Sequence, residues 1–228
     1  MKQSDIQVTL IDHMGSDLSV VNAARVSFHK ESEFERNENS YGHLNVKDEK
    51  LVNYLAKHKH TSPFNHAFIT MRVKAPIFVA RQLVKHKFMP WNEVSRRYVD
   101  EEPEFYVPHA FRKKADNVKQ GSSETEFIPE SLWSFKDAQE DVIEHSYESV
   151  KLYNHLLENE VCAEQARMVL PQNMMTEWIW SGTLGAWCDM LRLRLDPHTQ
   201  YESRIVAQKA REIIEPLFPV SVKALLDV

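Results

Sequence analysis

The mixture of strand-like and helix-like segments constrains the fold of this chain more than any other feature of its sequence. Strand-like sequence occurs at residues 6–11 (IQVTLI), 66–73 (HAFITMRV) and 175–182 (MTEWIWSG). Longer segments with apolar residues at helical spacing lie between and after them. No repeat, low-complexity linker or shift in composition marks a boundary within the 228 residues. We therefore predict one α+β domain that spans residues 1–228.

Seven segments have the periodicity or the end signals of helices: 17–28, 46–58, 76–87, 131–159, 161–170, 184–195 and 198–218. Asp17 is suited to cap the first of them, and Asp196 with Pro197 supplies an N-cap and a first-turn proline for the last. Residues 112–130 contain few large apolar side chains, so we predict that they form a surface insertion.

A local excess of positive charge occurs in an acidic chain. The formal net charge is -5, yet residues 85–98 (KHKFMPWNEVSRRY) hold two lysines, two arginines and a histidine around a single acid, Glu93. A dedicated nucleic-acid-binding domain is usually basic as a whole, so the acidic balance argues against that class. The positive charge must therefore serve something local.

The sequence also indicates where the protein is found. The N-terminus has no apolar segment of the kind that a secretory signal needs, and no apolar run approaches the ~18 residues that cross a membrane. The two cysteines, Cys162 and Cys188, lack CxxC spacing, so neither a redox pair nor a structural zinc site is indicated. We predict a cytoplasmic protein with no metal and no membrane or nucleic-acid partner.

Residues 76–87 form an amphipathic helix on a helical wheel. Ile77, Ala80 and Val84 group on its apolar arc, and the opposite arc carries a row of donors: Arg81, Gln82, Lys85 and His86. Such a row is consistent with an ordinary solvated face. It is also consistent with a pocket for an anion, because charge-assisted hydrogen bonds contribute roughly 1.5–3 kcal/mol each. Composition leaves both interpretations open.

The order of residues after this helix carries a resemblance to a known family. His86-Lys87, followed by seven residues and then Ser95-x-Arg97-Tyr98, resembles the signature of the flavin-dependent thymidylate synthases (the ThyX family). Further segments resemble the same family in order and spacing: NAARVSF, KHKHTSPFNH, VKAPIFVARQ, EFYVP, EQARMVLP and LRLDPHTQ. The resemblance extends over roughly residues 14–205.

This resemblance implies a fold and an activity. The fold would be the ThyX type, with a mostly antiparallel central sheet flanked by long helices. The enzyme would be a homotetramer that makes dTMP from dUMP, with active sites where subunits meet. Methylenetetrahydrofolate would supply the carbon, FAD would carry the hydride, and NADPH would reduce the flavin.

The resemblance also assigns residues to ligands. The residues expected at dUMP are Gln82, Lys85, Glu93, Val94, Ser95, Arg96, Arg97, Arg167 and Arg194. The residues expected at FAD are His60, Ser62, Lys85, His86, Lys87, Glu93, Thr183, Leu184, Gly185, Asp189 and His198.

Two residues are expected to take part in catalysis. Arg194 corresponds to the arginine that stabilises the uracil in its N3-deprotonated form, a role suited to a guanidinium because it stays charged. Ser95 is expected to position the substrate, since no catalytic base adjoins it in the sequence. Neither Cys162 nor Cys188 has a neighbouring histidine, so a cysteine nucleophile is not indicated.

The chain departs from the family pattern at several of these positions. Lys85 and Lys87 replace arginines, which keeps the charge but loses the planar fork. The other departures are Arg96 where a small or neutral residue is common, Thr183 and Gly185 where Asn and Arg often contact flavin, and Asp189 in place of Asn. One alternative is therefore a divergent member that makes another 5-substituted deoxyuridylate.

Two further alternatives belong to other functional classes. His58, His60 and His66 resemble part of a zinc site, which would make the chain a metal-dependent hydrolase. Phe88 and Trp91 could instead serve as stacking platforms beside the basic residues of a nucleic-acid-binding module.

Overall fold

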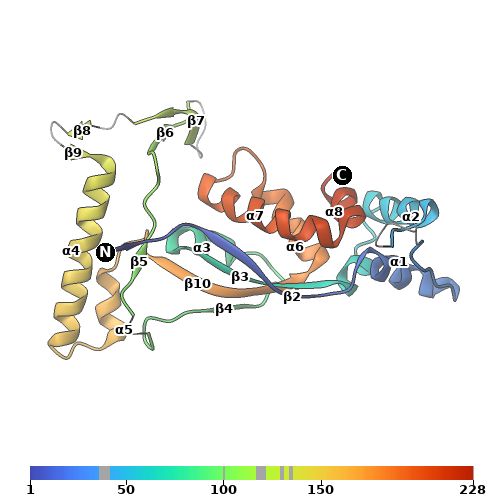
Figure 1. Ribbon diagram of the computed structural model, residues 1–228, viewed down its shortest axis with the longest axis horizontal. Helices are drawn as coiled ribbons and strands as arrows, with labels where there is room; N and C mark the ends of the chain where they lie inside the picture. The colour runs from blue at the N-terminus through green and yellow to red at the C-terminus, as the bar shows by residue number, and fades with distance from the viewer. Residues whose placement is uncertain (36–41, 100, 117–121, 129–130, 134–135, 228) are drawn as a thin grey trace.

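A four-stranded antiparallel sheet forms the centre of the protein. The computed structural model describes residues 1–35, 42–99, 101–116, 122–128, 131–133 and 136–227 (Figure 1). The sheet has the order β2-β3-β10-β4, and its strands span Gln7–Met14, Phe68–Pro76, Met175–Thr183 and Trp91–Glu93. Every pairing in it is antiparallel. The predicted α+β class and its antiparallel sheet are confirmed.

Alternation along the two central strands gives the sheet one buried face. Ile69, Met71 and Val73 on β3, with Trp178 and Trp180 on β10, are almost fully buried. The intervening residues Thr70, Arg72 and Ile179 are more exposed, because successive strand residues point to opposite faces. On that second face Arg72 pairs with Glu177 at 2.7 Å, and the hydroxyls of Thr70 and Ser181 lie 3.0 Å apart.

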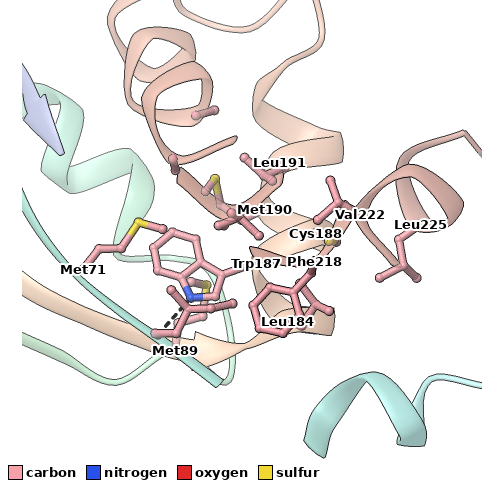
Figure 2. Close-up of a cluster of buried hydrophobic side chains, with 14 of the residues drawn as sticks. Met71, Met89, Leu184, Trp187, Cys188, Met190, Leu191, Phe218, Val222 and Leu225 are labelled. Carbon is pink, nitrogen blue, oxygen red and sulfur yellow. Dashed lines mark hydrogen bonds between the residues drawn. The ribbon is translucent and has the colours of Figure 1, made fainter. Parts of the chain in front are cut away.

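Helices cover the buried face. Helices α6 (Leu184–Arg194), α7 (Tyr201–Leu217) and α8 (Pro219–Leu226) lie along it, with α1 (Asp17–Arg25) and α2 (Val46–Lys57) beside α8 (Figure 1). Trp187 of α6 lies at the centre of their shared core, among Met71, Met89 and Leu184 (Figure 2). Its indole Nε1 donates to the carbonyl of Ile69 at 3.1 Å. Loss of such a buried side chain typically costs about 3–5 kcal/mol.

Most of the remaining elements lie toward the other end of the sheet (Figure 1). Helix α4 (Ala138–Glu158) packs with α5 (Ala163–Ala166) over a smaller core that includes Phe105 and Tyr153. The short strands are β1 (Lys2–Gln3), β5 (Glu104–Phe105), β6 (Arg112–Lys114), β7 (Ser122–Phe127), β8 (Ser131–Trp133) and β9 (Lys136–Asp137). Helix α3 (Ile77–Leu83) and the 3-10 helices η1 (Val26–Phe28), η2 (Ser62–His66) and η3 (Arg167–Val169) complete the described elements.

Several predicted helix ends were wrong. Asp17 does not cap its own helix: Ser16 is the N-cap, and the Asp17 carboxylate accepts from the backbone N–H groups of Val220 and Ser221 at 2.9 Å. It therefore caps α8, a helix that the sequence analysis missed because Pro219 follows α7 after only one non-helical residue, Phe218. Tertiary contact, not local sequence, decides which donors this carboxylate satisfies.

Several helices are shorter than predicted, and α1 and α5 each continue into a 3-10 helix, η1 and η3, within the predicted segments 17–28 and 161–170. Helix α7 begins at Tyr201, because the Asp196 carboxylate instead accepts from the His198 N–H and closes a turn. The segment predicted as helix from 131 forms β8 and β9 before α4 begins at Ala138. Helix α3 ends at Leu83, and Val84, assigned to the apolar arc, is 49% exposed.

No helix in the described ranges combines the length and the apolar character needed to cross a membrane. The predicted insertion at 112–130 contains β6 and β7, and its residues 117–121 and 129–130 lie outside the described part of the chain.

Candidate active site

A cavity of about 640 Å³ gathers four of the residues predicted for dUMP. Glu93 and Val94 come from the end of β4, which pairs with β10 through Glu93 and Trp178. Arg96 follows on the next turn, and Arg167 reaches the same cavity from the start of η3. The turn-forming sequence after α3 thus adds β4 to the sheet as an edge strand. Its pairing with β10 brings together residues that are far apart in the chain.

The electrostatics of this cavity depend on which of its charges are already paired. Five glutamates line it: Glu93, Glu101, Glu102, Glu104 and Glu177. Three of them have cationic partners within the chain, at Lys74, Arg72 and the Met1 amine. The Lys74 ammonium, by its hydrogen bond, lowers the pKa of the Glu104 carboxyl. Most of the negative charge is therefore already neutralised.

Three guanidinium groups of the cavity lack a carboxylate partner among the described residues. Arg167 donates to the backbone carbonyl of Glu164 at 3.2 Å, and Arg96 donates to that of Glu101. Arg81 of α3 lines the same cavity and makes no ion pair within the described ranges. Guanidinium groups bind phosphate strongly through paired hydrogen bonds. The cavity can therefore bind an anion even though it contains five carboxylates.

Glu93 is held by uncharged donors. Its two carboxylate oxygens accept from the Thr176 hydroxyl at 2.7 Å and from the Trp91 indole at 3.0 Å. Trp91 is itself stacked on Trp178, with ring centroids 4.2 Å apart. One face of the Trp91 ring is therefore already engaged within the protein.

A second cavity, of about 790 Å³, gathers three of the residues predicted for FAD. Thr183 caps α6, accepting from the Ala186 N–H at 3.2 Å while donating to the Asn65 amide oxygen at 2.8 Å. Gly185, the second residue of α6, also lines this cavity, and a Cβ added to it would come within 2.9 Å of that same oxygen. Asp189, the third residue, is exposed and pairs with Arg192 at 3.1 Å.

The arginine expected to act on uracil lies in a third group, near the end of α6. The Arg194 Nε donates to His86 Nε2 at 3.0 Å, and its Nη2 donates to the Gln82 carbonyl at 3.2 Å. The Gln82 amide oxygen accepts from the buried Ser203 hydroxyl of α7 at 3.1 Å. Three residues of the predicted site are thus in direct contact, and α3 is joined through them to α6 and α7.

Burial and charge set the protonation of this group. Burial is the main cause that lowers the pKa of His86, from 6.5 to about 4, and the adjacent Arg194 guanidinium lowers it further. The Asp189 charge raises the pKa of His86, so this carboxylate lies close enough to interact with the imidazole ring. Burial also lowers the pKa of the Arg194 guanidinium. His86 is therefore neutral at physiological pH, as a hydrogen-bond acceptor beside a cation must be.

The lowered pKa predicts an acid-sensitive contribution to stability. His86 stays neutral in the folded protein down to about pH 4, whereas in the unfolded chain it gains a proton below its ordinary pKa of 6.5. The contribution is present above pH 6.5 and is lost as the pH falls toward 4, because the unfolded state then binds the extra proton. We expect a loss of about 1–2 kcal/mol, reduced from the full shift because the ring is only half-buried.

Urea unfolding of the wild type and of His86→Gln at several pH values and one fixed protein concentration measures this contribution. The variant should lose about 1–2 kcal/mol less than the wild type between about pH 7 and pH 4.5. Equal losses in the two proteins would assign the acid sensitivity to other groups.

The remaining predicted residues line neither cavity. Ser95 accepts from Arg97 Nε at 3.1 Å, and the Arg97 guanidinium lies 5.0 Å from the centre of the Tyr98 ring. The side chain of Leu184 is fully buried in the core, so only its backbone is available to a ligand. The others, all exposed on the surface of the single chain, are Lys85, Lys87, His60, Ser62 and His198.

Two of the three histidines proposed for a metal lie beside a tyrosine. The Tyr54 ring is 4.3 Å from that of His58 and 6.0 Å from that of His60. Within the described ranges, no three His, Cys, Asp or Glu side chains are grouped as a metal site requires.

Burial raises the pKa of the Cys188 thiol to about 12, which makes it a poor nucleophile.

Comparison with known proteins places this geometry in a family. A family model described as "Thymidylate synthase complementing protein" matches residues 9–220. A flavin-dependent thymidylate synthase from Thermus thermophilus is 39% identical over 214 residues, which cover 94% of this chain and 73% of the relative. Another, from Thermosipho africanus, is 38% identical over 218 residues that cover 95% and 89%. The chain belongs to the flavin-dependent thymidylate synthase family.

Solved structures extend the likeness to three dimensions. The crystal structure of a UMP/dUMP methylase, PolB from Streptomyces cacaoi, bound with 5-Br dUMP, matches with a TM-score of 0.80 at 28% identity. The match covers 100% of this chain and 97% of that one. The structure bound with 5-Br UMP matches with a TM-score of 0.76 over 99% and 95% of the two chains. The predicted ThyX-type fold is thus confirmed.

The structure adds residues that the family resemblance assigned to no ligand. Arg81 lines the first cavity, and Lys59, Asn65 and Arg192 line the second. Asn65 lies within the KHKHTSPFNH segment that resembles the flavin-dependent thymidylate synthase family, so its neighbourhood was visible in the sequence. Its contact with Thr183 was not, because the two are 118 residues apart.

Proposed function

We propose that this protein is a flavin-dependent thymidylate synthase that converts dUMP to dTMP. The observation that carries the proposal is the convergence of three arginines without carboxylate partners in the described ranges, Arg81, Arg96 and Arg167, on one cavity at the end of β4. A dianionic phosphate matches such a group of guanidiniums. Membership in the flavin-dependent thymidylate synthase family supplies the reaction.

The reaction replaces the hydrogen at C5 of uracil by a methyl group. We propose that methylenetetrahydrofolate supplies the one-carbon unit, that C5 loses its proton, and that a hydride equivalent completes the methyl group. A bound flavin would supply this hydride once NADPH has reduced it. Arg194 stabilises the negative charge that develops on the uracil and so raises the electron density at C5.

The second cavity fits a flavin nucleotide by its donor set. Lys59 supplies positive charge for a diphosphate, while Arg192 is already paired with Asp189 and donates to the Leu225 carbonyl. Phe64 and Phe88 supply an apolar and aromatic wall. The Thr183 hydroxyl already donates its proton to the Asn65 amide oxygen. We propose that the Asn65 amide nitrogen then takes the place of the donors that Thr183 and Gly185 lack.

We propose that the enzyme is a homotetramer whose active sites form between subunits. Lys85, Lys87 and Arg97 line neither cavity of the single chain, so a neighbouring copy is needed to bring such residues to a ligand. Large apolar side chains are exposed outside the cavities as well: Phe28 is 74%, Tyr98 77% and Met168 78% exposed. Exposed apolar groups of this size are typical of interfaces. Light scattering of the purified protein tests the assembly.

We also propose that residues 1–228 act as one domain in the cytoplasm, with residues 112–130 as a surface insertion. The sheet supports a single unit, because its strands come from residues 7–14 through 175–183. The two cysteines are free, which suits a reducing compartment.

A flavin spectrum and a labelled product test the proposed function together. The purified protein should be yellow, and NADPH should bleach it in the absence of oxygen. With dUMP and labelled methylenetetrahydrofolate, mass analysis should find one labelled methyl group on the nucleotide. A protein that stays colourless with added FAD, or a product with another substituent, would contradict the proposal. UMP offered beside dUMP tests which sugar is accepted.

Replacement of Ser95 by alanine is expected to weaken turnover without abolishing it. The Ser95 hydroxyl contacts only Arg97 in the described chain and has no base beside it, so it is suited to positioning and not to nucleophilic attack. We expect a loss of about tenfold in kcat, the value of one hydrogen bond. Complete loss in the variant, with a covalent Ser95–nucleotide adduct trapped in the wild type, would restore a nucleophilic role.

A further inference from the structure

The Arg194 guanidinium is anchored by one of its two usable edges. A guanidinium has five N–H donors. The Nε–H donates to His86 Nε2 at 3.0 Å, and one Nη2–H donates to the Gln82 carbonyl at 3.2 Å. These two donors form the side-on edge of the group. Three donors remain: one on Nη1 and one on Nη2 form the adjacent, end-on edge, and the second Nη1 proton points toward the Cδ side.

Both acceptors are fixed by the protein. The Gln82 carbonyl lies in the last turn of α3, where carbonyl groups lack a partner within the helix. Its side chain is tied to the fully buried Ser203 of α7. His86 follows α3 after a single turn and lies 6.2 Å from the ring of buried Trp180. Both acceptors of Arg194 are therefore held in place by contacts with the buried core.

His86 can accept from Arg194 only in one protonation state. Its Nε2 must carry a lone pair, so the ring is neutral and its proton lies on Nδ1. Partial burial and the adjoining guanidinium both favour this neutral form. A lysine at position 194 could not use the arrangement, because an ammonium has no second edge to offer once it is anchored.

We propose that His86 is a positioning residue for catalysis: with the Gln82 carbonyl it holds the side-on edge of Arg194, so that the end-on edge meets the uracil. The role goes beyond the flavin contact that the family resemblance assigns to His86, and it rests on the proposed function. Orientation of a charged donor affects the chemical step more than binding, since a small misplacement can cost about 100-fold in rate.

Glutamine, leucine and lysine at position 86 separate the possible roles. Gln places an amide oxygen near the position of Nε2, so His86→Gln should retain kcat for dTMP formation within about threefold. His86→Leu removes the acceptor, and His86→Lys adds a repelling charge. Both should lower kcat by about 10- to 100-fold. Val84→Thr, a change at the exposed residue that directly follows α3, is the matched control.

Four readouts are taken on each variant: bound FAD, the rate of flavin reduction by NADPH, dUMP affinity and kcat. A positioning role predicts a loss in kcat with the first two unchanged and with dUMP affinity lowered less than about fivefold. Loss of FAD from His86→Leu, or the same kcat for Gln and Leu, would overturn the proposal. So would full activity in His86→Leu.

A failure of the proposed function gives a different result from a failure of the positioning role. If wild-type protein forms no dTMP, the function is wrong whatever the variants do. The anchor is then tested directly by nitrogen-15 NMR of labelled histidine, with His86→Gln used for assignment. A neutral ring protonated at Nδ1 is expected, and a ring protonated at Nε2 would contradict the anchor itself.

Discussion

Replacement of Arg194 by alanine is expected to abolish most dUMP methylation and to leave the flavin in place. Arg194 is half-buried, anchored through His86 and Gln82, and its guanidinium is the group expected to stabilise charge on the uracil. Removal of a single donor that stabilises developing charge typically costs about 100- to 1,000-fold in kcat. Its side chain lines neither cavity, so the cavity that gathers the predicted FAD residues is not directly altered.

Turnover of labelled methylenetetrahydrofolate with dUMP, together with the visible flavin spectrum, measures both parts of this prediction. Arg194→Lys is the matched variant, because it keeps the charge but loses the second edge of the guanidinium. It should recover less than a tenth of the wild-type kcat. Loss of FAD from Arg194→Ala with normal dUMP affinity would show that the residue serves the other ligand.

Replacement of Asp48 by asparagine is expected to cause the largest loss of stability from a single polar change. The Asp48 side chain is fully buried and accepts from Arg25 Nε at 2.8 Å, from the Ser32 hydroxyl at 3.1 Å and from the Asn45 amide at 2.8 Å. This carboxylate joins the start of α2 to the end of α1. Breaking a buried ion pair typically costs about 3–5 kcal/mol. We expect about 3 kcal/mol, because Arg25 can still reach water.

Glu49→Gln, one residue further along α2 and without a described ion pair, is the control and should change stability by less than about 0.5 kcal/mol. Urea unfolding at one protein concentration compares the three proteins, since assembly makes apparent stability concentration-dependent. A loss below about 1 kcal/mol in Asp48→Asn would mean that the substituted amide finds equivalent partners and that the charge itself contributes little.

Local sequence predicted the secondary structure best where one element dominates the pattern. The segments at 66–73 and 175–182 became the two central strands because alternate apolar side chains match the strand repeat. It predicted worst where a partner distant in sequence decides the outcome. Strand β4 forms from a turn-like sequence because β10 offers it an edge, and Asp17 caps α8 although some 200 residues separate them.

The candidate site shows the same division. The chain order of His86, Ser95 and Arg97 was enough to indicate the family, and family membership is confirmed. The helical wheel placed Arg81, Gln82 and His86 on one arc and left open whether they face solvent or an anion. In the structure Arg81 lines the cavity beside β4, whereas Gln82 and His86 contact Arg194. An arc about 100° wide can face two different neighbours once α6 packs against it.

The sequence by itself determined the fold class, the family and the types of side chain available for the chemistry, because these depend on residue order and on apolar periodicity. Only the tertiary structure decided which carboxylates neutralise which cations and which arginines remain for an anion. It also decided which edge of Arg194 stays free. These are properties of distance and burial between residues as far as 112 positions apart. Such distances are set when α3, α6 and the β4 edge pack together, and no local pattern contains them.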